Sequence, residues 1–414
     1  MEIEMSAARR TTITILFLLA ANSFAADWPC YRGPAQDGVI GETGLLLTWP
    51  AEGLQKLWSV PIDGKGTHSG PAVANGKVFV AGRLGTKDII RCVDASTGAA
   101  LWKYEYEAPG NVSYGPGPRA TPTVSGGFIY TLGAFGHLLC LKADSGEKVW
   151  ERNIVADFKG AVPNFGVSAA PLIEGEMLIC EPGGPEAGIV ALEKATGKEV
   201  WKSGKDKASY AAPQIVTLAG VRQVLCFPVS GLLALKPEDG KELWRLPYED
   251  GKNIAAPIIK GDLLYISDNN NGFAAFKIVS DGGKWRTERQ WGNPKDKAHT
   301  SSPVAGSASI YFYECMEHEG QIKSLDLKDG HLQWSVSCKG DDMNGNLLLA
   351  DEQHLIAGLS NGEILLLEVS AQACKEAARF KAADPGSFAP LAVSDSRLYV
   401  RDLKALSCYN LKAK

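Results

Sequence analysis

Short apolar segments separated by polar turns run through the chain, and they return at a spacing of about 45 residues. Each unit opens with a few apolar residues at a proline, as at residues 71–74, and continues into a second apolar segment such as 77–81. A third segment, such as 189–192, runs into a turn, and a fourth returns from it. Runs of this length bounded by turn residues predict β-strands. We therefore expect four antiparallel strands in each unit.

The most regular signature is the turn between the third and fourth strands. In five units a glycine lies four residues before a tryptophan, and a small residue lies ten before it, as in the segments 92–102 and 191–201. Glycine supplies the positive φ that such a turn needs. An indole buries a large apolar area, and its N–H needs an acceptor. The tryptophans expected to fill the gaps between neighbouring sheets are Trp58, Trp102, Trp150, Trp201, Trp244, Trp291 and Trp334.

Repeats of this size and strand content are typical of β-propellers. Seven units reach an outer strand, the seventh with Phe380 in place of tryptophan, whereas the last unit, 387–411, stops before one. The missing strand is expected at 54–60, because ring closure removes an exposed sheet edge. The sequence thus predicts an all-β fold: an eight-bladed β-propeller of four-stranded antiparallel blades closed by the N-terminal strand. Seven blades are the alternative if the Phe380 unit is degenerate.

The first residues have the pattern of a secretory signal. Arg9 and Arg10 precede an apolar run at 13–21, and small residues lead to Ala25. The run is short for a membrane span, which needs about 20 residues, although a retained anchor is the alternative. Cys30 follows no lipoprotein box, so no lipid anchor is expected. We assign 1–25 to a signal peptide, 26–53 to a leader segment and 54–414 to the propeller.

Charge and cysteine content narrow the choice of partners. The formal net charge of −4 gives no reason to expect nucleic acid, which selects basic surfaces. The nine cysteines would allow one or two disulfides in an exported chain. However, Cys92, Cys140 and Cys408 share the repeat position at which other units carry alanine or serine. A small buried thiol explains that position best.

One set of polar residues is defined by its place in the repeat. Positions three or four before the proline of each blade should gather around one mouth of the central channel, and concave mouths often bind ligands. A solvated polar rim is the alternative interpretation. The candidate ligand-binding residues are His68, Arg119, Ser168, Tyr210, Asn253, His299, Asn344 and Ser387.

No metal site is predicted. The oxygen-rich segment 268–272 lacks the alternating acidic spacing of a calcium loop and occupies a turn position. The acidic segment 340–346 lies where an inner strand begins, and 315–319 is expected at a hairpin tip without a second cluster of donors.

The string from Ala191 through Thr196-Gly197 to Trp201 resembles the tryptophan-docking repeat of pyrroloquinoline-quinone (PQQ) type propellers. That group includes quinoprotein alcohol dehydrogenases and the outer-membrane assembly lipoprotein BamB. The resemblance covers 54–411 and is specific for fold. The leader segment 27–38 is similar to the start of exported PQQ-like repeat proteins of no settled activity.

The resemblance implies an activity only where the site residues match. Quinoprotein dehydrogenases use an adjacent pair of cysteines, a calcium ion held by Glu, Asn and Asp, and an Asp base, whereas no two cysteines are adjacent here. We therefore expect no catalytic residue and no cofactor. The favoured hypothesis is a monomeric, non-catalytic scaffold of the periplasm or envelope that binds a protein or small-molecule partner. The alternatives are a PQQ- and calcium-dependent oxidoreductase with an altered site, and a carbohydrate-binding module.

Overall fold

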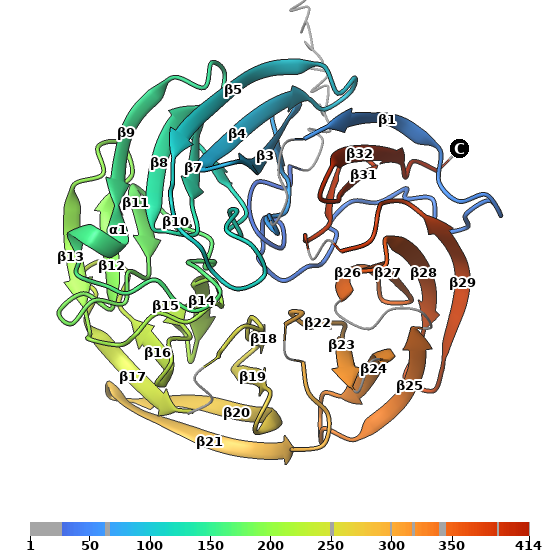
Figure 1. Ribbon diagram of the computed structural model, residues 1–414. Coiled ribbons are helices and arrows are strands. Elements are labelled where there is room, and N and C mark those ends of the chain that lie inside the picture. The colour runs from blue at the N-terminus through green and yellow to red at the C-terminus, as the bar shows by residue number, and fades with distance from the viewer. Residues whose placement is uncertain are drawn as a thin grey trace, which may run out of the picture.

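The computed structural model describes residues 27–62, 67–248, 252–298, 300–316, 319–338, 345–386 and 389–413. These residues form eight four-stranded antiparallel sheets, arranged as blades around a central axis (Figure 1). One short helix, α1 (Ile154–Asp157), is the helical content of the described part. No helix within it combines the length and apolar character needed to cross a bilayer.

The first four blades follow one another along the chain. Blade 1 consists of β2 (Ala72–Ala74), β3 (Lys77–Leu84), β4 (Lys87–Asp94) and β5 (Ala100–Glu107). Blade 2 consists of β6 (Thr123–Ser125), β7 (Phe128–Leu132), β8 (His137–Lys142) and β9 (Lys148–Asn153). Blade 3 consists of β10 (Leu172–Glu174), β11 (Met177–Cys180), β12 (Ile189–Glu193) and β13 (Glu199–Ser203). Blade 4 consists of β14 (Gln214–Leu218), β15 (Val221–Cys226), β16 (Gly231–Leu235) and β17 (Glu242–Pro247).

The remaining blades complete the ring. Blade 5 consists of β18 (Ile258–Lys260), β19 (Leu263–Asp268), β20 (Gly272–Asp281) and β21 (Lys284–Asn293). Blade 6 consists of β22 (Val304–Ala305), β23 (Ser309–Met316), β24 (Glu319–Asp326) and β25 (Leu332–Cys338). Blade 7 consists of β26 (Gly345–Asp351), β27 (His354–Leu359), β28 (Glu363–Val369) and β29 (Cys374–Lys381). Blade 8 consists of β30 (Ala392–Ser394), β31 (Arg397–Arg401), β32 (Ala405–Asn410) and β1 (Lys56–Pro61).

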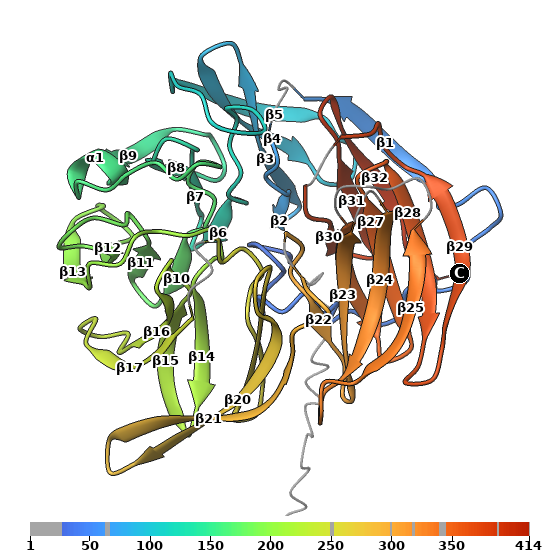
Figure 2. The ribbon, with the colours of Figure 1, turned by 60° about the horizontal axis from the view of Figure 1, so that its bottom comes forward.

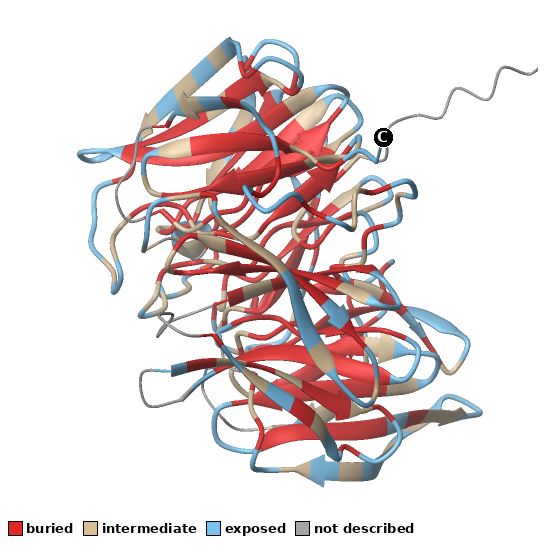
Figure 3. Ribbon diagram, turned by 90° about the vertical axis from the view of Figure 1, so that its right-hand side faces the viewer, coloured by how far each residue is buried: buried red, intermediate tan, exposed pale blue. Residues whose placement is uncertain are grey.

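The two ends of the chain share blade 8. Strand β1 pairs antiparallel with β32, and Trp58 lies opposite Cys408 (Figure 1). The expected closure by the N-terminal strand is therefore confirmed, as are the eight blades, and the seven-blade alternative is wrong. Buried side chains are concentrated in the middle strands of each blade, whereas outer strands such as β5 alternate between exposed and half-buried positions (Figure 3).

Tryptophans on the outer strands join each blade to the next one. The Trp58 indole N–H donates to the carbonyl of Ala95 in blade 1 at 3.1 Å, and Trp102 donates to Ala143 in blade 2 at 2.9 Å. The same bond to the following blade is made by Trp150, Trp201, Trp291 and Trp334. Trp244 is different: its N–H donates to the Gln223 side chain of its own blade at 2.6 Å. The next blade carries the long β20–β21 hairpin at that point.

A β-bulge accompanies each of these aromatic positions. The small residue of the repeat lies directly opposite the tryptophan, as Cys92 does to Trp102, and the register then shifts by one residue. The shift occurs in the outer pair of strands of all eight sheets. A bulge leaves one residue of the outer strand unpaired, and Leu101 is 46% exposed for this reason. Cys92, Cys140 and Cys408 are free, fully buried thiols, as expected of a small core residue.

The turn glycine has a second role that its conformation does not reveal. Gly98 adopts φ +73°, and a Cβ at this position would lie 2.9 Å from the Trp58 ring of the preceding blade. The corresponding glycines at 146, 197, 240 and 330 would meet the preceding tryptophan at 2.4 to 2.9 Å. Blade 7 ends in Phe380, and Gly53 of the leader takes the place of the turn glycine, with a Cβ distance of 2.3 Å. The aromatic ring of the preceding blade therefore packs directly against this turn, at the position of the glycine.

This geometry predicts unequal costs for two glycine substitutions. Gly76 has nearly the same φ, +71°, but no atom lies within 4 Å of a Cβ placed there. Gly98→Ala and Gly76→Ala should each lower the free energy of unfolding by roughly 1 kcal/mol, because alanine disfavours the left-handed backbone conformation. Gly98→Ala should cost about 1–3 kcal/mol more, because the Trp58 ring must move. Urea unfolding followed by circular dichroism measures both losses, and equal losses would contradict the seating role of Gly98.

Candidate functional site at the channel mouth

The leader crosses the centre of the ring and pairs with inner strands that would otherwise have an open edge (Figures 1 and 2). Trp28 exchanges two backbone hydrogen bonds of 2.8 Å with Val73 of β2, and Pro29 accepts from the Val124 N–H of β6 at 2.8 Å. Further along, the Ile40 N–H donates to Leu349 of β26 at 2.8 Å. Because buried backbone groups need partners, the leader satisfies the exposed edges of blades 1, 2 and 7.

Arg32 anchors the leader within the channel. It is 7% exposed, and its guanidinium donates to the carbonyls of Gln36, Asp37 and Pro303 at 3.0, 2.6 and 2.7 Å. Burial lowers the pKa of Arg32 from its usual value. The nearby Tyr31 hydroxyl is 3.0 Å from the Ser302 hydroxyl of blade 6. The leader is thus an integral part of the channel lining.

Two of the predicted mouth residues order the connection between blades 1 and 2. The His68 Nε2 atom lies 3.0 Å from the Tyr114 carbonyl oxygen. Arg119 donates to the carbonyls of Gly117, Ser113 and Gly115 within the same connection. Burial lowers the pKa of His68 to about 4, and the charge of Arg119 adds to this effect. His68 is therefore neutral at pH 7.

Three more predicted residues form a chain across the following connections. The Ser168 hydroxyl donates to the Tyr210 carbonyl at 3.3 Å, and the Tyr210 N–H donates to the Asn253 carbonyl at 3.1 Å. Asn253 is fully buried and donates from its side chain to Pro228 at 2.6 Å. The predicted residues His299, Asn344 and Ser387 lie outside the described residues. Four of the five described residues thus join neighbouring loops, and Arg119 orders its own connection.

The sequence analysis named Tyr210 but missed Tyr114 and Phe165, with which it forms an aromatic strip on the same loops. Phe165 lies 5.7 Å from Tyr114 and 5.2 Å from Tyr210 between ring centroids, with interplanar angles of 49° and 43°. The Lys252 ammonium lies 5.7 Å from the Phe165 centroid. Tyr114 is 65% exposed. Tyr114 and Phe165 lie just upstream of the predicted positions 119 and 168, which is the signal that could have found them.

A side groove of about 530 Å³ adjoins the aromatic strip. It lies between the connection of blades 1 and 2 and that of blades 2 and 3, which are joined by a Ser113 N–H to Asn164 hydrogen bond of 3.1 Å. The lining residues are Gly110, Asn111, Val112, Ser113, Phe135, Val162, Pro163 and Asn164. The side groove therefore combines apolar side chains with the polar groups of Asn111, Ser113 and Asn164.

The residues present do not fit the quinone-and-calcium group of the dehydrogenases that the repeat resembles. Among the described residues, no three His, Cys, Asp or Glu side chains converge as metal ligands. Two of the buried carboxylates are paired with cations: Asp88 accepts from Arg83 at 2.6 Å, and Glu314 pairs with Lys323. Asp268 accepts the N–H groups of the turn that follows it, at 2.8 and 2.6 Å. The turn expected at 268–272 is thereby confirmed.

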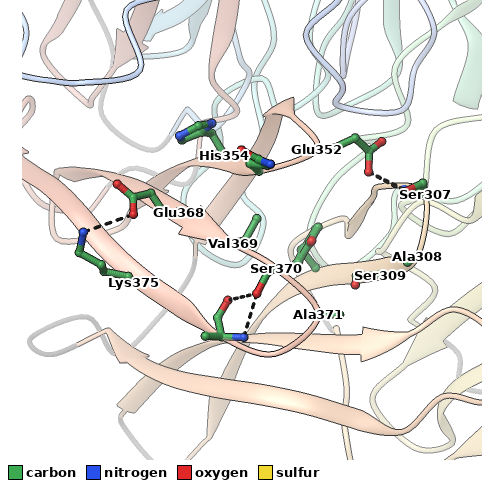
Figure 4. A pocket seen from close by; sticks show the side chains of 13 residues that line it. Ser307, Ala308, Ser309, Glu352, His354, Glu368, Val369, Ser370, Ala371 and Lys375 are labelled. Atoms are coloured by element: carbon green, nitrogen blue, oxygen red, sulfur yellow. Dashed lines mark hydrogen bonds and ion pairs between the residues drawn. The ribbon is translucent and has the colours of Figure 1, made fainter.

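A second hollow, of about 580 Å³, lies on blades 6 and 7 near the turns at 307–309 and 370–373 (Figure 4). Its polar groups bond to their neighbours. Glu352 accepts from the N–H and hydroxyl of Ser307, both at 2.8 Å, and Glu368 lies 3.3 Å from Lys375. The charges of this second hollow are internally matched, so it is the weaker candidate.

Glu181 is a buried carboxyl at the end of β11, next to the mouth loops. It is 2% exposed. Burial raises the pKa of Glu181 to about 8, Asp206 reinforces the shift, and the Cys226 thiol opposes it. A carboxyl whose folded pKa lies above its unfolded value stabilises the fold at low pH, and that stability is lost as the pH rises toward the folded pKa.

Replacing the Glu181 carboxyl should make the free energy of unfolding depend less on pH. The pKa of the Glu181 carboxyl is near 4.5 in the unfolded chain and about 8 in the folded one. Its ionisation therefore lowers the free energy of unfolding by roughly 3 kcal/mol between pH 4 and pH 7. Glu181→Gln should therefore gain about that much over the wild type between pH 4 and pH 7. Urea unfolding across this range measures the gain, with Glu186→Gln, an exposed glutamate of the same blade, as control. If the free energy of unfolding changes with pH in the same way for the wild type, Glu181→Gln and Glu186→Gln, the raised pKa of Glu181 is contradicted.

Comparison with known proteins identifies the family of the chain. A family model described as outer membrane protein assembly factor BamB matches residues 50–113 and 86–336, more than half of the 414 residues. BamB of Shewanella oneidensis is 31% identical over 163 residues, which cover 39% of each chain. The dehydrogenase subunit of a quinone alcohol dehydrogenase from Gluconacetobacter polyoxogenes is 29% identical over 198 residues, covering 45% of this chain and 26% of that subunit. The chain thus spans less than two-fifths of the length of either curated relative.

Solved structures agree on the fold. BamB from Moraxella catarrhalis superposes with a TM-score of 0.60 at 17% identity, covering 87% of this chain and 98% of that one. A quinohemoprotein alcohol dehydrogenase from Pseudomonas putida HK5 superposes with a TM-score of 0.69 at 14% identity, covering 94% and 81%. At these identities the likeness shows the propeller alone. Together with the family match, it shows that this chain belongs to the family of the outer membrane protein assembly factor BamB, whose blades carry PQQ-like repeats.

Proposed function

We propose that this protein is an exported propeller that binds a partner in the cell envelope through its channel mouth and catalyses no reaction. The observation that carries the proposal is the aromatic strip. Its three rings lie on three consecutive blade connections, and Tyr114 leaves 65% of its surface exposed. Aromatic side chains exposed in this way are typical of binding surfaces.

The surrounding structure supports a rigid recognition surface. The rings stand on loops held by the hydrogen bonds of His68, Arg119 and Asn253. A surface ordered before binding loses little conformational entropy when the partner arrives. Export is supported by the secretory pattern of residues 1–25 and by relatives named as an outer membrane assembly factor.

The chemistry of the mouth supports binding over catalysis. A catalytic site needs a titratable group within reach of a substrate. His68 is half-buried and bonded to a backbone carbonyl, and Glu181 is 2% exposed. The buried carboxylates Asp88 and Glu314 are paired with cations. These groups stabilise the fold and the loops.

Crosslinking at defined positions tests the proposed binding face. Benzoylphenylalanine introduced at position 114 should give a discrete crosslinked product in intact cells that export the protein, identified by mass spectrometry. The same photoreactive residue at position 332, a 48% exposed outer-strand position on blade 6, is the control. Equal products at both positions, or none at either, would contradict a partner at the mouth.

Reconstitution tests the oxidoreductase alternative. The mature protein, given PQQ and calcium, should show no quinone binding at micromolar concentration by fluorescence titration and no dye reduction with alcohols or sugars. The reasons are the absence of adjacent cysteines and the engaged buried carboxylates. Micromolar binding that Arg119→Ala or Asn253→Ala abolishes would favour the oxidoreductase instead.

A further inference from the structure

Positive charge gathers on the connections between blades 1 and 5, although the whole chain carries −4. The described residues of these connections are 108–122, 154–171, 204–213, 248 and 252–257. Their cations are Arg119, Lys159, Lys205, Lys207 and Lys252. Their described carboxylates are Asp157 and Asp206, which are ion-paired with Arg152 and Arg245, both at 2.7 Å. Glu249 and Asp250, which precede Lys252 in the sequence, lie outside the described residues.

The cations surround the apolar surface of the mouth. Lys252 lies against the Phe165 ring, and Arg119 is bonded to the loop that carries Tyr114. Tyr114 and Val162, 65% and 38% exposed, add apolar area beside the side groove. Since Coulomb attraction between exposed charges acts over about 10 Å, carboxylates of a ligand on the aromatic strip would be within range of Lys252 and Arg119.

The tilt of the rings argues against a flat ligand. A quinone or a sugar ring stacks best on an open, parallel aromatic face. The rings of the aromatic strip are inclined to each other by 43° and 49°, so together they form no single flat stacking face. The side groove beside the rings offers a further recess, in which the apolar side chains of Val112, Phe135 and Val162 lie with the amides of Asn111 and Asn164. Several separate contact points of this kind suit the successive side chains of an extended peptide.

We propose that the mouth binds an extended acidic peptide segment of a protein partner, a proposal that rests on the partner-binding function above. Apolar side chains of the segment occupy the side groove and the edges of the aromatic strip. Its carboxylates lie beside Lys252 and Arg119. Because Lys252 is exposed and attraction between exposed charges is screened by salt, affinity falls as ionic strength rises.

A pair of synthetic peptides tests the proposal on the full mature chain. The first is a fluorescein-labelled twelve-residue peptide that alternates Phe or Leu with Glu or Asp, and the second replaces Glu and Asp with Gln and Asn. Fluorescence anisotropy should show binding of the acidic peptide and an affinity about tenfold lower for the neutral one. Raising the salt concentration should weaken the first and leave the second nearly unchanged. Equal affinities for the two peptides would overturn the proposal.

Variants locate the binding and separate this proposal from the one on which it rests. Lys252→Glu and Tyr114→Ala should each weaken acidic-peptide binding about tenfold. Lys284→Glu, at the exposed start of β21, and Leu332→Ala, on β25, are matched controls and should not change it. Equal loss in the controls would overturn the proposed site.

Competition and crosslinking decide between the remaining outcomes. Polygalacturonate that displaces the acidic peptide at lower carboxylate concentration would overturn the proposal in favour of an anionic carbohydrate. If neither peptide binds while position 114 still crosslinks to a protein in cells, the acidic-peptide proposal is wrong and the partner-binding function stands. If peptide binding and crosslinking both fail, both proposals are wrong.

Discussion

The contact between a tryptophan of one blade and the turn of the next is the interaction on which the ring depends. In the described part of the chain, the eight blades are separate sheets that share no strand pairing. Each sheet must therefore be attached to its neighbours through side chains. Trp58 does this for the closing blade by packing its ring under Gly98 and donating its N–H to Ala95. The indole is thereby buried with its polar atom satisfied, which makes the apolar contact also a directional one. Repetition of this contact sets the spacing of the blades.

The exceptions to this contact show what the ring tolerates. Trp244 faces the long hairpin of blade 5 and turns its N–H to Gln223 of its own sheet, so the indole is still satisfied. Phe380 has no N–H, and its ring packs against Gly53 and, edge-on, against Trp49 at 5.7 Å. The leader thus completes two incomplete parts of the fold: it provides the seat for blade 7 and it pairs with the inner strands of the channel. Ring closure and channel lining therefore both depend on the N-terminal segment.

A rigid ring leaves its variable chemistry to the connections between blades. The connections between blades 1 and 5 carry the aromatic strip, the side groove and the cluster of cations. Polar residues such as Arg119 and Asn253 form their hydrogen bonds with the loops themselves. These polar residues fix the loops, and of the aromatic side chains on them Tyr114 is exposed, whereas Phe165 and Tyr210 are half-buried.

The sequence by itself determined the blade architecture, because its signals are local and repeat. Glycine four residues before a tryptophan, a small residue opposite it at ten, and the unpaired strand at residues 54–60 were enough to predict eight blades and their closure. Only the tertiary structure decided which blade each tryptophan contacts, where the leader runs, and that Tyr114, Phe165 and Tyr210 form one strip. These residues come from irregular connections without a period, and their proximity is created by the ring, which places loops about 50 residues apart in the sequence side by side.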